Sequence, residues 1–404
     1  MPKQSAYKKE LIKQLYFLGA QSSSDLSIRT DKSIPLIVRL ISELIDEKII
    51  VESGLATSTG GRRPQVYSLV QDLAYIVCVS MDQMVTRIAM VDMNNNYVGD
   101  IKRVSLVLAN HKMALDELVH HITGFIKESG VPKHKIIGIG VGMPGFVDIA
   151  KGINHSFLQT GSDKSVVETI EATTGLRVFI DNDSSLIALA ELRFAAAAGK
   201  QNVMVINIGW GIGLGIIING ELFRGNNGFA GEFSHIPLFT NNKLCACGKT
   251  GCLETEASLA VIAEKAIEGI HKGRVTMLSD LSLDNIEETS EKIMKAALKG
   301  DKFAVELLSE AGYHIGRAIA ILIHLLNPEL IILSGRGSVA GKLWLTPVQQ
   351  AIHEHCIPNI AENTNIEIST LRGEAELIGA AALVMEHYDE LDKTPGALLL
   401  TADK

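Results

Sequence analysis

The feature that most constrains this chain is a group of cysteines in the stretch HIPLFTNNKLCACGKTGCLE, residues 235–254. Cys245, Cys247 and Cys252 lie within eight residues, and His235 precedes the first of them by ten positions. One imidazole and three thiolates fill a tetrahedral zinc shell and leave no open position for a substrate. The spacing therefore predicts a structural zinc site, with a group of reduced surface thiols as the alternative.

Length and composition indicate a multidomain protein of the cytoplasm. The 404 residues exceed what one hydrophobic core usually supports, so we expect two or three domains. No apolar run reaches the roughly 18 residues that cross a bilayer, and the start MPKQSAYKKE lacks the apolar core of a signal peptide. Because thiols stay reduced in the cytoplasm, the cysteine group is better explained by a metal than by disulfides.

The charge is divided unevenly along the chain. Residues 1–70 hold 10 Lys and Arg against 7 Asp and Glu, a balance of +3, which leaves −11 for the remainder of a chain whose formal charge is −8. A small basic head on an acidic body is the asymmetry typical of a head that binds a polyanion.

The first fifty residues have the pattern of three helices. The first is expected to stop at Gly19, the second to be capped by Ser23 or Ser24, and the third to be capped by Ser33 with Pro35 in its first turn. Arg39 and Ser42 lie off the apolar face of the third helix. That face is formed by Ile37, Leu40, Ile41, Leu44 and Ile45.

Two strand-like runs, 48–53 and 65–70, follow these helices and predict a winged helix-turn-helix domain over residues 1–70. Its third helix would enter the major groove, while a Gly-Gly-Arg-Arg wing would approach phosphates or a narrow minor groove. The alternative is a head that mediates subunit contact, with the arginine pair in a solvated loop. The candidate DNA-binding residues are Ser33, Leu36, Arg39, Gly60, Gly61, Arg62 and Arg63.

The acidic body is predicted to be a mixed-sheet α/β protein of two lobes. Strand-like runs such as AYIVCVSMD, VTRIAMVDM, KIIGIGVGMPG and LRVFIDND belong to the first lobe, residues 73–183 with 377–404. The second lobe, residues 184–376, begins with the glycine-rich hairpin NVMVINIGWGIGLGIIING and contains the cysteine group. We expect the surface for oligomerisation on this second lobe.

The order of motifs resembles the ROK family, which comprises sugar kinases and winged-helix repressors. GVGMPG, DND, the glycine hairpin, GFAGEFSH and CACGKTGCLE occur in the family's order. The resemblance implies a two-lobed, actin-like (ribonuclease H-like) fold with a structural zinc site. The family's C-x-C-G-x2-G-C-x-E pattern is met in full by Cys245, Cys247, Gly248, Gly251, Cys252 and Glu254.

The resemblance also implies a sugar site between the lobes. In the family, the histidine that matches His235 binds the metal through one nitrogen and a sugar hydroxyl through the other, so that zinc orients a ligand-binding side chain. Carboxylate and amide groups suit vicinal hydroxyls, since they accept and donate hydrogen bonds. The matching positions are Gly145, Asn182, Asp183, Glu232, His235 and Glu254.

The phosphate-binding parts of the family's kinases are missing. Asp183 matches their general base, but the D-x-G-G-T loop that gives backbone N–H groups to ATP phosphates is absent. Trp210 and Leu214 also depart from the kinases' second glycine loop, and plain hairpin geometry is an alternative explanation for its remaining glycines. We therefore expect no ATP binding and a vestigial Asp183. The positions of the missing loop are Ser80, Met81, Asp82, Gln83 and Met84.

These features predict a sugar-responsive transcriptional regulator, most simply a repressor. Its expected partners are a double-stranded DNA operator, a sugar or sugar phosphate, and further copies of itself in a homodimer or homotetramer. Membrane insertion is not expected. Two alternatives stay open: an ATP-dependent kinase of a hexose or N-acetylhexosamine, and an interaction module whose effector is another protein, such as a sugar transporter.

Overall fold

A computed structural model describes residues 2–56, 63–158 and 164–391. The chain forms two compact units, Met1–Leu186 with Leu377–Lys404, and Ile187–Glu376. The head expected over residues 1–70 is part of the first unit. Within the described ranges, no helix is both long enough and apolar enough to span a membrane.

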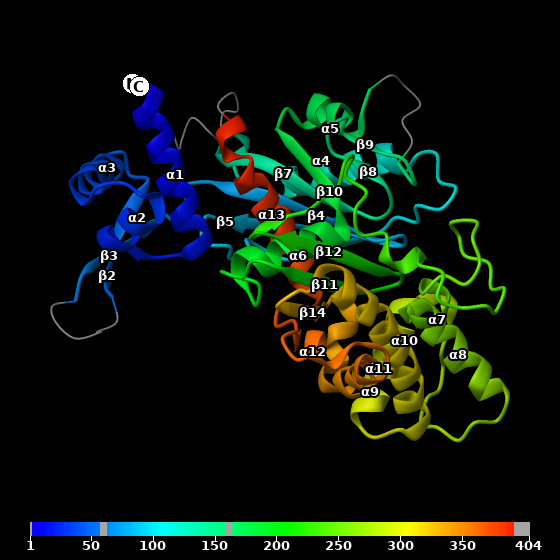
Figure 1. Cartoon of the computed structure of the whole chain (residues 1–404). Helices are drawn as coiled ribbons and strands as arrows, with labels where there is room; N and C mark the ends of the chain where they lie inside the picture. Colours follow the sequence, from blue (N-terminus) through cyan, green and yellow to red (C-terminus); the bar gives the residue numbers. More distant parts are fainter. Residues whose placement is uncertain (1, 57–62, 159–163, 392–404) are drawn as a thin grey trace. The chain divides into compact units, whose positions relative to one another are not determined.

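The first unit begins with three helices beside a small antiparallel sheet of order β1-β3-β2 (Figure 1). The short strand β1 pairs with β3, and β3 pairs with β2, so one sheet joins the helical part to the hairpin. These elements are α1 (Pro2–Leu18), β1 (Gln21–Ser22), α2 (Ser23–Thr30), α3 (Ile34–Asp46), β2 (Ile50–Leu55) and β3 (Gln65–Leu69).

The cap of α2 differs from the one expected. Ser22, not Ser23 or Ser24, is the N-cap: its hydroxyl accepts from Asp25 N at 3.2 Å, and the Asp25 carboxylate accepts from Ser22 N at 3.2 Å. This capping box satisfies two backbone donors that a cap one residue later would leave unpaired. Ser33 does precede α3 as predicted, but within the described chain its side chain makes no capping hydrogen bond.

Helix α3 buries one apolar face against the rest of the head. Four of the five residues predicted for that face are buried, whereas Ile45 is only partly so. Arg39 and Ser42 are exposed, as their positions off the face require. The helix is therefore held by packing, which commonly contributes more to helix stability than propensity does. The buried four are Ile37, Leu40, Ile41 and Leu44.

The body of the first unit is a five-stranded sheet of order β10-β7-β4-β5-β6. The pairs β4–β5 and β5–β6 are antiparallel, and β4–β7 and β7–β10 are parallel. Helices α4 (Ala114–Glu128) and α5 (Val166–Thr174) share a hydrophobic cluster with one face of the sheet. The strands are β4 (Tyr75–Met81), β5 (Val85–Asp92), β6 (Lys102–Ser105), β7 (Ile136–Met143) and β10 (Val178–Asn182), with β8 (Val147–Asp148) and β9 (Ile153–Asn154) as a separate pair.

Helix α13 (Ala375–Glu386) packs against the opposite face of that sheet. A Cβ placed on Gly140 of β7 would lie 2.0 Å from Ala380 O, so only glycine admits the helix at this distance. Helix α6 (Asp183–Phe194) follows β10 directly. The first unit thus has helices on both faces of one mixed sheet.

The second unit has its own five-stranded sheet, of order β13-β12-β11-β14-β15, and a helical layer built on the long helix α10 (Figure 1). Its strands are β11 (Val203–Ile208), β12 (Ile212–Ile218), β13 (Glu221–Leu222), β14 (Leu330–Ser334) and β15 (Asn365–Ile368). Its helices are α7 (Glu254–Ala257), α8 (Leu259–His271), α9 (Ile286–Leu298), α10 (Lys302–Leu326), α11 (Leu345–His355) and α12 (Pro358–Ala361). The short 3₁₀ turns are η1 (Lys133–Lys135) and η6 (Tyr388–Glu390) in the first unit, and η2 (Phe233–His235), η3 (Leu283–Asn285), η4 (Arg336–Leu343) and η5 (Arg372–Glu374) in the second.

Candidate metal centre and sugar site

The second unit brings the predicted metal ligands together. His235 ends η2, the three cysteines lie in the loop before α7, and the four ligand atoms are all within 4.8 Å of one another. His235 Nδ1 is 3.5 Å from Cys245 Sγ, and Cys247 Sγ is 3.7 Å from Cys252 Sγ. Cys245 and Cys252 are buried and Cys247 is exposed, so the cluster lies at the edge of the unit's core.

These spacings fit a tetrahedral zinc ion. Zn–S bonds of about 2.3 Å and Zn–N bonds of about 2.0 Å place two sulfur ligands about 3.8 Å apart and a sulfur and a nitrogen about 3.5 Å apart. The separations of 3.5 Å and 3.7 Å match these values, and the donor set of one imidazole and three thiols is one that zinc prefers. A bound zinc here would have a closed shell and would supply structure, not hydrolysis.

Two glycines shape the loop that carries the cysteines. Cys245 N donates to Lys249 O at 2.8 Å and Gly248 N donates to Cys245 O at 2.9 Å, which turns the chain back on itself. Gly248 has φ 82° and Gly251 has φ 78°. A Cβ on Gly251 would also lie 2.0 Å from Phe239 O. The backbone conformation therefore favours glycine at both glycine positions of the C-x-C-G-x2-G-C pattern.

Two of the three thiols, those of Cys245 and Cys252, resist deprotonation in the absence of a cation. Burial, followed by the contact with Cys247, raises the pKa of Cys252 to about 12, and burial raises the pKa of Cys245. At Cys247 burial acts in the same direction, but hydrogen bonds from Lys249 N and the neighbouring thiols outweigh it and lower the pKa. Metal binding would remove this cost, because zinc displaces the thiol protons.

The second nitrogen of His235 faces the carboxylate of Glu232. His235 Nε2 is 3.7 Å from Glu232 Oε2. Desolvation raises the pKa of Glu232; the charge of His235 opposes this shift, and that of Glu254 adds to it. Glu254 begins α7, and its Oε2 lies 2.6 Å from where a Cβ on Gly211 would be. Three of the six predicted sugar-binding residues therefore meet beside the metal cluster.

The other three predicted sugar-binding residues meet in the first unit. Asn182 ends β10 and its Nδ2 donates to Gly145 O at 3.1 Å. Its Oδ1 accepts from Ser184 N at 2.9 Å, and Asp183 Oδ1 accepts from the same N–H at 2.7 Å, which fixes both side chains at the start of α6. A Cβ on Gly145 would lie 2.5 Å from Ser156 Oγ.

Sequence reasoning missed the residues that hold the Pro-Gly loop. The buried Asn154 donates from Nδ2 to Pro144 O at 2.9 Å, and its Oδ1 accepts from the backbone N–H groups of Ser156 and Phe157, both at 2.9 Å. Ser156 Oγ accepts from Phe146 N at 2.9 Å. The only signal in the sequence is an Asn-His-Ser turn, which is too common to indicate this role.

The hairpin between β4 and β5 carries the residues that the sequence resemblance matches to the kinases' phosphate loop. Asp82 Oδ1 accepts hydrogen bonds from Met84 N and Val85 N, both at 2.7 Å. The Asp82 carboxylate thus accepts hydrogen bonds from backbone N–H groups of the kind that a phosphate loop offers to its ligand. Arg87 donates to Ser80 Oγ at 2.8 Å across the same hairpin.

The second glycine loop is also filled by side chains. The Arg336 guanidinium lies 5.3 Å from the centre of the Trp210 ring and is 2.7 Å from Glu287 Oε1. Leu214 is buried in the sheet that follows the loop. The ion pair with Glu287 thus positions Arg336, and the guanidinium of Arg336 holds the Trp210 ring by a cation–π contact.

The candidate DNA-binding residues are only partly described. Ser33 and Arg39 are exposed on α3, Leu36 is half-buried, and Arg63 is exposed before β3. Gly60, Gly61 and Arg62, the centre of the predicted wing, lie outside the described residues.

Comparison with known proteins decides the family. The model of the ROK family matches residues 77–387. The chain therefore belongs to the ROK family. Its body has the actin-like, sugar-kinase-type fold of that family, whose solved structures include a ROK family transcriptional regulator, a homologue of the Escherichia coli MLC protein. That regulator is 26% identical and superposes with a TM-score of 0.75 over 99% of this chain and 98% of its own.

ROK relatives of two kinds resemble the chain over different lengths. The glucokinase of Halalkalibacterium halodurans is 35% identical over 294 residues, which are 72% of this chain and 86% of the relative. The xylose repressor of Caldicellulosiruptor bescii is 29% identical over 379 residues, which are 90% of this chain and 91% of the relative. The repressor match is thus less identical but includes more of the chain.

Proposed function

We propose that this ROK protein is a sugar-responsive, DNA-binding transcriptional regulator, and that it represses genes of carbohydrate metabolism. The observation that carries the proposal is the extent of the regulator resemblance, 90% and 99% of the chain, against 72% for the glucokinase. A DNA-binding head is what distinguishes a regulator from a kinase on this fold. The protein would act in the cytoplasm, the compartment that holds the DNA.

The head, residues 1–70, would be a winged helix-turn-helix. Three helices, a β-hairpin and an excess of positive charge support this reading. Helix α3 would enter the major groove, and the segment between β2 and β3, which contains Arg62 and Arg63, would form the wing and contact phosphates.

The effector would be a sugar, and each of the two units holds candidate residues for it. Glu232, His235 and Glu254 offer acceptors and one imidazole nitrogen, and Asn182 and Asp183 offer an amide and a carboxylate. Such groups pair with the hydroxyls of a pyranose or pentose. A structural zinc held by the cysteine cluster would fix the ring of the histidine.

We propose that the protein does not use ATP. This proposal is supported by the Asp82 carboxylate, which accepts from Met84 N and Val85 N, and by the stacked Trp210, both at positions that the resemblance matches to the kinases' phosphate-binding loops. Asp183 would then be a sugar contact and no longer a base. An ATP-dependent sugar kinase remains the second candidate, favoured by the glucokinase resemblance and by the presence of Asp183.

Sugar binding would weaken DNA binding by changing the geometry of the paired heads in a homodimer or homotetramer. Dyad-symmetric operators require two heads at fixed spacing, so a modest change of geometry is sufficient. A coupling free energy of about 1–3 kcal/mol, or about 5- to 150-fold in affinity, is typical of such regulators.

The test begins with selection of duplexes from a random library by the full-length protein. Binding of a selected duplex is followed by fluorescence anisotropy while free sugars and sugar phosphates are titrated. We expect steep weakening of DNA binding with salt and about 5- to 150-fold weakening by one class of sugar. If no sugar changes the affinity, the sensor proposal fails.

Two variants separate the candidate functions. Glu232→Gln should abolish the sugar response, whereas Glu268→Gln, an exposed change on α8, should leave it intact. A response that survives Glu232→Gln would favour an effector of another kind, such as a transporter protein that docks on the body. ATP turnover with a hexose that disappears in Asp183→Asn would favour the kinase.

A further inference from the structure

We propose that the DNA-facing surface of α3 reads thymine through its C5-methyl group, with Ile34 and Val38 as the reading side chains. The inference rests on the proposed function and goes beyond it, because it assigns a base and a chemical group to residues that sequence reasoning did not select.

Two branched apolar side chains protrude from the N-terminal half of α3. Ile34 is 51% exposed and Val38 is 50% exposed, although both belong to residue types that are usually buried. They are four residues apart and therefore lie on one side of the helix, one turn from each other. The buried residues Ile37, Leu40, Ile41 and Leu44 lie on an adjacent side of the helix, so the exposed pair borders the buried face, on the edge of the surface that also carries Arg39 and Ser42.

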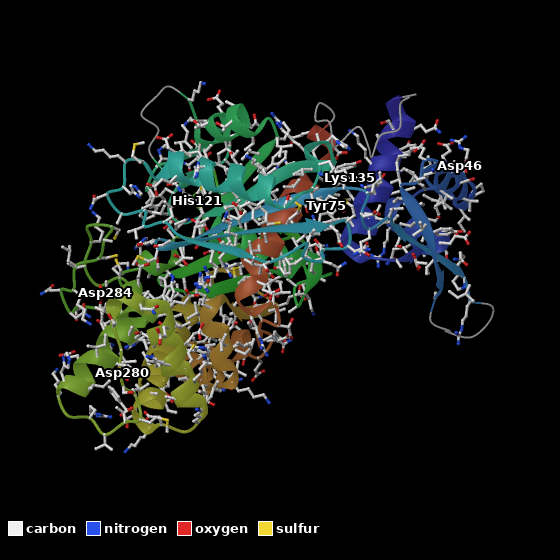
Figure 2. The ribbon with its side chains drawn as sticks, turned by 180° about the vertical axis from the view of Figure 1, so that it is seen from behind. Asp46, Tyr75, His121, Lys135, Asp280 and Asp284 are labelled. Atoms are coloured by element: carbon white, nitrogen blue, oxygen red, sulfur yellow. The ribbon has the colours of Figure 1, made fainter. Side chains whose placement is uncertain are left out.

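The residues around the pair point to DNA as the occupant. Arg39 is exposed next to Val38 and the head carries a net charge of +3. Asp46, the last residue of α3, lies on the outside of the head at the far end of the helix (Figure 2). The acid would repel phosphates, so the half of α3 that contains Ile34 and Val38 is the half suited to the groove. Recognition helices of this class contact bases with their N-terminal residues.

A protein partner fits this surface less well. Two half-exposed side chains supply far less than the roughly 800 Å² that each partner contributes to a stable interface. Their exposed neighbours are Pro35, Arg39 and Ser42, none of them aromatic, unlike the core of such interfaces.

The chemistry of the major groove then selects the base. Guanine, cytosine and adenine present only hydrogen-bonding groups there, and thymine alone adds a methyl group. Isoleucine and valine side chains cannot make hydrogen bonds, so a methyl group is the partner they accommodate without leaving a polar base edge unpaired. The polar Arg39 and Ser42 on the following turn are left to read other base edges or phosphates.

Replacement of thymine by uracil tests this directly, because it removes the methyl group and leaves base pairing unchanged. In duplexes selected by the full-length protein, each thymine is replaced singly by deoxyuridine and the affinity is measured by anisotropy. We expect one or two positions in each half-site at which the replacement weakens binding by about fourfold, the effect of one buried methylene-sized group.

The protein side is tested with Ile34→Ala and Val38→Ala, both of which change exposed side chains and should fold. Each variant should bind the thymine duplex more weakly and lose the deoxyuridine penalty at one position. Val275→Ala, at a 95% exposed site of the second unit, should retain every penalty.

The outcomes distinguish the two proposals. If duplexes are selected but no deoxyuridine weakens binding, or if the penalties persist in both alanine variants, thymine reading is refuted and DNA binding stands. If no duplex is selected at all, the proposed function fails.

Discussion

The two glycines of the cysteine loop allow a sharp prediction about the metal centre. Gly248 and Gly251 have nearly the same positive φ, but a Cβ on Gly248 would have nothing within 4 Å, whereas a Cβ on Gly251 would lie 2.0 Å from Phe239 O. Alanine at either position has to adopt left-handed backbone. Only alanine at 251 also collides with another segment.

The expected magnitudes follow from this difference. Left-handed backbone costs a non-glycine residue about 1–2 kcal/mol, so Gly248→Ala should weaken zinc binding by about 5- to 30-fold. In Gly251→Ala the chain must also separate from Phe239, which breaks the 3.1 Å hydrogen bond from Phe239 N to Gly251 O beside the ligand Cys252. A lost hydrogen bond and a displaced ligand add about 1–2 kcal/mol, for a total weakening of about 30- to 900-fold.

Zinc affinity is the suitable readout, because metal binding and formation of the loop are one equilibrium. Competition with a chromogenic chelator at fixed pH would give the affinity of the parent protein and of both variants. Equal affinities for the two alanine variants would show that the contact with Phe239 does not hold the loop, and would refute the reasoning.

Three other predictions concern the rest of the molecule. Removal of zinc by a chelator should lower the thermal stability of the second unit and abolish the sugar response, as shown by calorimetry and anisotropy; an unchanged melting profile would contradict the structural role. Burial raises the pKa of Glu191, whose Oε1 accepts from Ser334 Oγ at 3.2 Å, so its contribution to stability is present at low pH and is lost as pH rises through the folded-state pKa. Denaturant titrations should therefore show that the free energy of unfolding of Glu191→Gln rises relative to that of the parent protein as pH increases from 4 to 8. A difference that does not change with pH would argue against a buried titrating carboxyl. Lys13 Nζ donates to Glu386 O at the end of α13 at 2.8 Å, so Lys13→Met should speed amide exchange in α1 by up to about 10-fold, while Lys102→Met, on an exposed ion pair, should not.

Much of the fold could be predicted from local pattern. The alternation of apolar residues indicated the strands, the apolar face of α3 was correct at four of five positions, and the motif order indicated the family. The cysteine spacing predicted four ligands that the structure brings within 4.8 Å, because few other arrangements place three cysteines and a histidine so close.

What could not be predicted depends on contacts between distant segments. The cap at Ser22 was missed because three serines precede Asp25 and only the backbone geometry selects among them. Asn154 was missed because its partners are in the Pro-Gly loop, ten residues earlier. The absence of a D-x-G-G-T motif was visible in the sequence, but the hydrogen bond that the Asp82 carboxylate accepts from Met84 N was not.

In the proposed function, a bound sugar weakens the binding of a DNA duplex to this protein, and a bound duplex weakens the binding of the sugar. Isothermal titration of the effector sugar into the zinc-loaded protein, alone and saturated with a selected duplex, tests this most directly. Because linkage is reciprocal, the sugar should bind more weakly to the DNA complex by the same factor, about 5- to 150-fold, by which it weakens DNA binding. Equal sugar affinities in the two titrations would contradict the account.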